Sequence, residues 1–271
     1  MSGAVGDEAE IARVVARVRE LLRDYRPPSF DHVPDPDAAL FLCAVDHRTG
    51  YEAGHLVAGE GPFAGSELMW AVALRAARGR RGLLGAGGLA GVTAEEVADL
   101  FRIDDETVAD PGRRAELWRD LAAGLDRDHD GEARRLLAAA GARLGGGGGL
   151  VALLAYYRAY ADPLAKKSQL FGKICERRGW FEVADPECWE VSADNVLMRL
   201  GLRSGLVASG DLDRVRADTR AAFKRVAAAA GVTPPLLDDL LWELGRHDPD
   251  LLGRQAGDLR EPPRERGVHW Y

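Results

Sequence analysis

Apolar residues recur at helical spacing along most of the chain, which predicts a mainly α-helical protein. Residues 7–25 carry one such stripe, and residues 112–125 carry another with Leu117, Trp118, Leu121 and Leu125 on one side. Residues 150–160 are apolar nearly all round, so we expect a buried helix there. The same reading predicts further helices at 65–78, 93–100, 131–141, 210–230 and 236–246.

The N-terminal region departs from this helical spacing. Residues 38–46, AALFLCAVD, form a short continuous apolar run between prolines and a charge, which favours a buried strand. HLVAG at 55–59 is a second short candidate, so residues 38–59 are predicted to form a small antiparallel hairpin. The glycine-rich stretches 78–91 and 145–149 are interpreted as loops, because neither has the spacing of a nucleotide-binding glycine loop.

Two helix starts carry recognisable caps. Ser66 is a plausible N-cap of the helix at 65–78, and Thr93 with Glu96 fits a capping box. Mainly α structure with a small N-terminal β element is therefore the expected fold class. We expect one domain over residues 1–271, with an N-terminal helix and linker (1–30), the β element (31–60) and a helical body (61–271).

Composition narrows the class of protein. The 271 residues carry a net charge of −7, whereas proteins that grip duplex DNA usually show a basic footprint. The three cysteines include no CxxC pair, so neither a zinc nor an iron–sulfur site is indicated, and no HExxH or HxH spacing suggests another metal. No apolar run resembles a signal or a membrane span, which favours a soluble cytoplasmic protein.

The strongest candidate chemistry lies between Asp162 and Val207. Lys166 and Lys167 open one predicted helix, where cations are mildly disfavoured by the helix dipole; they are either a solvated helix start or partners for a phosphate or carboxylate. Asp194 and Asn195 open the next helix. Asp194 is either an ordinary cap or a carboxylate that stabilises a cationic sugar during cleavage of an N-glycosidic bond.

Other candidates lie outside that stretch. Asp46 ends the apolar run at 38–46, where a charge marks either a sheet rim or a pocket. Trp242 and Glu243 lie on the last helix, where a core tryptophan beside an exposed glutamate is the simple interpretation. No GxSxG setting or Ser-His-Asp arrangement is evident.

Seven weak matches, in order along the chain, resemble the queuosine salvage proteins from about residue 38 to the C-terminus. They are FLCAVDHRTGY with Asp46, GSELMWAVALRAA, LFRIDDETVADPGRRAELW, Lys166-Lys167-Ser168-Gln169, Ala193-Asp194-Asn195-Val196 running on to SGLV, Leu241-Trp242-Glu243, and Arg266-Gly-Val-His269-Trp270. The sequence departs from the family pattern at Thr49, which replaces an asparagine, at Glu243, which replaces an aspartate, and in an aromatic run reduced to Tyr51.

The resemblance implies a helical fold like that of the helix-hairpin-helix DNA glycosylases. It also implies hydrolysis of the N-glycosidic bond of a 7-deazaguanine-like nucleotide or nucleoside, without a cofactor or metal. Asp194 would stabilise the cationic sugar, and Lys166 would bind phosphate or assist departure of the base. The substrate-binding residues implied are Asp46, Tyr51, Lys167, Asn195, Trp242, Glu243 and His269.

Two other interpretations stay open. Asp194 followed by an apolar helix also resembles an element of the DNA-repair glycosylases, but the LxGxGxxxA hairpin is missing and the net charge disfavours duplex DNA. A non-catalytic nucleotide-binding protein could use the same fold. A small-molecule nucleotide or nucleoside is therefore the expected partner.

Overall fold

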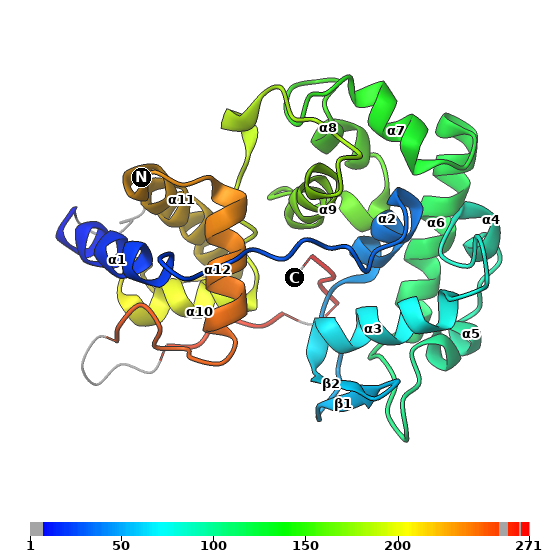
Figure 1. Ribbon diagram of the computed structural model, residues 1–271, viewed down its shortest axis with the longest axis horizontal. Coiled ribbons are helices and arrows are strands. Elements are labelled where there is room, and N and C mark those ends of the chain that lie inside the picture. The colour runs from blue at the N-terminus through cyan, green and yellow to red at the C-terminus, as the bar shows by residue number, and fades with distance from the viewer. Residues whose placement is uncertain (1–7, 255–259, 266, 271) are drawn as a thin grey trace. The chain divides into compact units, whose positions relative to one another are not determined.

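The computed structural model describes residues 8–254, 260–265 and 267–270, and it confirms a mainly α-helical protein with a small β element. Two compact units can be distinguished in it (Figure 1). Unit 1 comprises the chain up to Ser29 and Pro186–His269; unit 2 comprises Phe30–Asp185 with Trp270. None of the helices described is both long and apolar enough to cross a bilayer.

Unit 1 is a set of packed helices. They are α1 (Glu8–Leu21), the short 3-10 helix η2 (Pro186–Cys188), α10 (Asn195–Ser204), α11 (Leu212–Ala230) and α12 (Pro234–Gly245). Helix α1 packs along α11, and α10 packs against both α11 and α12. Gly245 permits the α10–α12 approach, because a Cβ there would lie 2.6 Å from a side-chain carbon of Leu200. The helices predicted at 7–25, 210–230 and 236–246 are thus confirmed; Asp7 lies outside the described residues.

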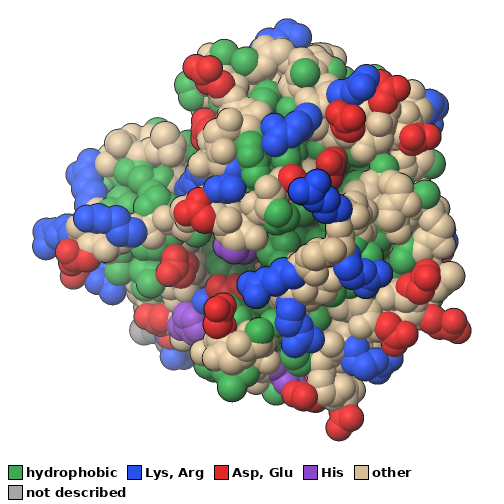
Figure 2. Space-filling view, turned by 45° about the vertical axis from the view of Figure 1, so that its right-hand side comes forward, with side chains coloured by type: hydrophobic (Ala, Val, Ile, Leu, Met, Phe, Trp, Pro, Cys, Tyr) green, Lys and Arg blue, Asp and Glu red, His purple; other side chains and the backbone are tan. Residues whose placement is uncertain are grey.

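Unit 2 contains the remaining elements. They are α2 (Pro36–Val45), β1 (His55–Val57), β2 (Glu60–Phe63), α3 (Gly65–Ala77), α4 (Ala86–Leu89), α5 (Ala94–Leu100), α6 (Pro111–His129), α7 (Ala133–Ala140), α8 (Leu150–Leu154), the 3-10 helix η1 (Arg158–Tyr160) and α9 (Lys166–Arg177). The predicted Thr93–Glu96 capping box is present at the start of α5. Basic and acidic side chains both occur, between hydrophobic areas, across the face drawn in Figure 2.

The strand predicted at 38–46 is wrong, because this segment is the helix α2. Asp35 is its N-cap and accepts a hydrogen bond from the Ala38 amide at 2.8 Å, and Pro36 occupies the first turn, where proline is favoured. The helix is apolar on all sides because α6, α7, α9 and η1 pack around it (Figure 1). The prolines that suggested a strand boundary are therefore part of a helix start.

Three local predictions also need correction. The sheet pairs β1 with β2, whereas the predicted hairpin used residues 38–46 as its first strand. The helix predicted at 150–160 ends at Leu154, and Tyr156 is 83 % exposed in the turn before η1. The short helix α4 interrupts the loop predicted at 78–91, whereas 145–149 is a loop as predicted.

Candidate functional site

A buried polar cluster lies where α2 ends in unit 2. The carbonyl groups of the last turn of a helix lack intrahelical partners, so they attract hydrogen-bond donors and positive charge. At this end three cationic side chains converge: Arg114 from α6, and Lys166 and Lys167 from the first turn of α9. All three are buried. The cluster also contains Asp46, the first residue after α2.

Arg114 is fully buried and donates to the last carbonyl group of α2 and to carbonyl groups of the chain that follows. Its guanidinium donates to the carbonyl oxygens of Val45, His47 (2.6 Å) and Arg48 (3.0 Å) after α2, and to that of Ala109 (2.9 Å). Burial lowers the pKa of the guanidinium to about 10, although the negative charge of Asp46 acts to raise it. One side chain therefore fixes the path of residues 45–48, on which Asp46 lies.

Lys167 is fully buried on the same helix end. Its Nζ donates to the Ala44 carbonyl at 2.6 Å and lies 3.3 Å from Nδ1 of His47. Burial lowers the pKa of Lys167 well below its usual value, and the charges of Lys166 and Arg114 lower it further, while Asp46 opposes them. Lys167 is therefore a cap of α2 in the interior and does not reach solvent.

Stability should depend on pH through Lys167. Its folded pKa is depressed from 10.5, so between the two pKa values the unfolded chain binds more protons and folding becomes more favourable as pH rises. We expect the free energy of unfolding of the wild type to rise relative to that of Lys167→Met by up to about 1.4 kcal/mol per pH unit in that window. Urea titrations from pH 7 to 10 measure this difference, and parallel curves for the two proteins would contradict it.

Asp46 and Lys166 are each 8 % exposed, whereas Arg114 and Lys167 are fully buried. Oδ1 of Asp46 accepts a hydrogen bond from the Ser66 hydroxyl at 2.8 Å, and the Lys166 Nζ donates to the Asp46 carbonyl at 3.2 Å. Within the described part of the chain, Oδ2 of Asp46 has no partner, although the residue is only 8 % exposed. The Lys166 ammonium is thus held at the backbone of the residue that carries the carboxylate.

Lys166 owes its position to the chain before α9. Both oxygens of Asp162 accept backbone hydrogen bonds at 3.1 Å, one from Leu164 and one from Lys166 itself. Ala165, the N-cap residue, adopts a left-handed conformation with φ 51°. This tight turn places a lysine at a helix start, as predicted, but turns it inward instead of toward solvent.

Tyr51 lies in the same unit as Asp46 and is half-buried. Its hydroxyl donates to the Phe101 carbonyl at 2.6 Å, and burial raises its pKa to about 12. Its ring packs on a small apolar cluster that includes Val57 and Leu68. The structure therefore gives Tyr51 a packing role in addition to any contact with a ligand.

The remaining predicted site residues belong to unit 1. Asp194 is the N-cap of α10, and its Oδ1 accepts a hydrogen bond from the Leu197 amide at 2.9 Å. Asp194 is partly exposed, as is Asn195, the first residue of α10. Capping fixes the carboxylate of Asp194 and leaves it in contact with solvent, so the structural and the catalytic interpretations are compatible.

Trp242, Glu243 and His269 have defined surroundings. Trp242 is partly exposed, and the Arg246 guanidinium lies over its ring, 4.8 Å from the ring centroid. The prediction of a core tryptophan is therefore wrong. Glu243 is exposed, as the simple interpretation expected, and accepts a hydrogen bond from the Tyr25 hydroxyl at 3.0 Å. His269 is buried, and Arg266 of the same C-terminal segment lies outside the described residues.

Sequence reasoning missed several polar residues, and two of them carried a signal. Arg114 lies three and four residues before Leu117 and Trp118, on the apolar stripe of its helix. Asp238 lies three residues before Leu241 on the buried face of α12, and its carboxylate accepts a hydrogen bond from the Ser192 amide at 2.9 Å. A charged residue on an apolar stripe is therefore the signal that could have identified both. Ser66 was assigned as an N-cap, whereas Ala64 is the N-cap of α3 and Ser66 binds Asp46.

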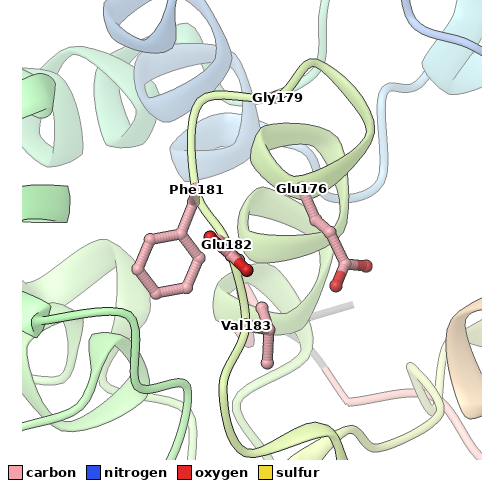
Figure 3. Close-up of a pocket in the computed structure, with 5 residues that line it drawn as sticks. All are labelled: Glu176, Gly179, Phe181, Glu182 and Val183. Carbon is pink, nitrogen blue, oxygen red and sulfur yellow. The ribbon is translucent and has the colours of Figure 1, made fainter.

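A pocket in unit 2 lies away from this cluster. It has a volume of about 360 Å³ and is lined by Glu176, Gly179, Phe181, Glu182 and Val183. Figure 3 shows Glu176 on the last turns of α9 and the other residues on the segment that follows. Ten residues separate Glu176 from Lys166, or about 15 Å along a helix, so this pocket belongs to the opposite end of α9.

Among the described residues, no group of three His, Cys, Asp or Glu side chains is arranged to hold a metal ion. A scan against protein-family models finds no match for the chain, and a search of curated proteins finds none either.

Proposed function

We propose that the protein is an N-glycosidase that hydrolyses the bond between sugar and base in a 7-deazaguanine-like nucleotide or nucleoside. One observation carries most weight: the Lys166 ammonium donates to the backbone carbonyl of Asp46, both residues are only 8 % exposed, and Oδ2 of the Asp46 carboxylate is available to a ligand. Isolated buried charges are costly, so a fold that keeps such a pair beside a helix end already capped by Arg114 and Lys167 supports a binding role.

The chemistry of the pair suits the polar edge of a base. Oδ2 of Asp46 accepts hydrogen bonds from N–H groups, while Nζ of Lys166 donates to a carbonyl or phosphate oxygen. A 7-deazaguanine edge presents both an N–H row and a carbonyl group. Ser66 and the turn at Asp162 orient the two side chains before a ligand arrives, which reduces the entropy lost on binding.

We assign to Asp194 the role of stabilising the sugar in the transition state. In hydrolysis the C–N bond breaks, water supplies a hydroxyl group to the sugar carbon, and the base leaves with the bonding electrons and a proton. Positive charge grows on the sugar in the transition state, where a fixed carboxylate lowers the barrier. The hydrogen bond from the Leu197 amide fixes Asp194 in this way.

The test is incubation with a panel of nucleosides and 5′-monophosphates, including 7-deazapurines, with free base detected by mass spectrometry. We expect release from a 7-deazaguanine compound. Release of base from a lesion-containing duplex instead, or tight nucleotide binding without turnover, would contradict the proposal in favour of a repair glycosylase or a binding protein.

Asp46→Asn should then weaken substrate binding. The variant removes the charge of the carboxylate and replaces one acceptor with a donor, while its remaining oxygen can still accept from Ser66. We expect KM to rise by at least about tenfold, because a hydrogen bond to a charged group is worth about 1.5–3 kcal/mol. Asp35→Asn is the matched control, since it alters the carboxylate at the opposite end of α2 but keeps the N-cap. Equal KM values for both variants would remove Asp46 from the site.

A further inference from the structure

His55, on β1, lies between two carboxylates of the turn that follows α5. Its Nδ1 is 2.9 Å from an oxygen of Asp104, within hydrogen-bonding distance. Its Nε2 is 3.3 Å from an oxygen of Glu106, and this contact is electrostatic without the geometry of a hydrogen bond. Glu106 also accepts a hydrogen bond from the Glu52 amide at 2.9 Å. The turn is closed by two backbone hydrogen bonds between Ile103 and Glu106. A protonated imidazole therefore links the β-hairpin to a well-defined turn.

The hairpin also packs on α3. Beneath it lies a small apolar cluster made of Val57, Leu68, Val72 and Ile103, with Tyr51, Phe63 and Ala71 packed against it. Small clusters under surface segments open at lower free energy than a domain core. Ile103 comes from the same turn as the two carboxylates, so the ionic contact and the apolar contact hold the same two segments together.

The hairpin is joined directly to the candidate site. Strand β2 ends at Phe63 and α3 begins at Gly65, and the next residue, Ser66, donates the hydrogen bond that orients Asp46. Leu68 and Val72 of α3 belong to the cluster under the hairpin. Only residues 64 and 65 therefore separate the end of the hairpin from Ser66.

We propose that the hairpin is a pH-dependent latch, in which protonated His55 holds β1 and β2 against the 103–106 turn and thereby keeps Ser66 on Asp46. The described charges that act on the imidazole are those of Asp104 and Glu106, from the one turn that faces it. The hydrogen bond to Asp104 raises the pKa of His55, burial lowers it by a smaller amount, and Glu106 raises it further. The latch is therefore fully engaged below the ordinary pKa of 6.5 and is lost as pH rises through the raised value.

Hydrogen exchange of the whole protein tests the latch without a substrate. Protection factors for the amides of residues 55–66, corrected for intrinsic exchange, should fall by about threefold between pH 5.5 and 8.5, since exposed ion pairs contribute modestly. The protection factors of the buried amides of α6 should not fall over this pH range. His55→Gln should abolish this pH dependence, and Asp104→Asn should move its midpoint to lower pH. The same pH dependence in the wild type and in His55→Gln would overturn the proposal.

The consequence for ligand binding rests on the proposed function. If base is released, KM should rise with pH over the same range in the wild type and stay flat in His55→Gln. An inert enzyme that keeps the exchange pattern would refute the N-glycosidase and support the latch. Turnover whose KM changes equally with pH in both proteins would refute the link to Asp46.

Discussion

Asp194→Asn is expected to lower the rate of base release at least about 100-fold while the protein stays fully folded. The expected loss follows from removing a fixed negative charge near a developing cation, which costs two to three orders of magnitude in comparable electrostatic sites. The fold should survive, because asparagine is as good an N-cap as aspartate and can still accept the hydrogen bond from the Leu197 amide. Initial rates and thermal melts of the same preparations measure both effects.

Capping and catalysis can be separated with one more pair of variants. Asp194→Ala removes the cap of α10 and should lose about 1 kcal/mol of stability as well as activity. Asp211 caps α11 in the same unit, with the Arg214 amide donating to it at 2.9 Å, and it has no assigned role in the reaction. Asp211→Ala should therefore lose the same stability and keep its rate. Wild-type turnover in Asp194→Asn would show that Asp194 is only a cap.

The helices could be predicted because their determinants are local. Apolar stripes place α1, α6, α11 and α12 within a few residues of their observed bounds, and the Thr93–Glu96 box marks the start of α5. The segment at 38–46 predicts a strand although it forms α2, because a buried helix has no polar face and its short apolar run resembles that of a buried strand. Its Asp35-Pro36 start was the local signal that distinguishes the two.

The candidate site depends on contacts that local patterns do not contain. The Ser66–Asp46 and Lys166–Asp46 hydrogen bonds join residues 20 and 120 positions apart. The sequence therefore identified Asp46 and Lys166 as candidates separately, and only the fold shows that they adjoin. The same holds for His55, whose carboxylate partners lie about 50 positions later in the chain and carried no recognisable spacing.

Arg114→Met is expected to cause the largest loss of stability, about 3–5 kcal/mol, because each buried carbonyl group left without a donor costs about 1–3 kcal/mol. Four carbonyl groups would lose this donor, and those of Val45 and His47 lie in the interior. The intrinsic stability of α6 should not change, because methionine and arginine have nearly equal helix propensities. Urea unfolding followed by circular dichroism measures the change.

The neighbouring residue supplies the control for this prediction. Arg113 lies on the same turn of α6, but it is partly exposed and pairs with Glu116 at 2.9 Å, so Arg113→Met should cost less than about 1 kcal/mol. A similar loss in both variants would mean that the carbonyl groups of residues 45–48 do not need Arg114. If the difference is as large as expected, the position of Asp46 depends on a cation that never meets a ligand, and Arg114→Met should lose nucleotide binding even at temperatures where it stays folded.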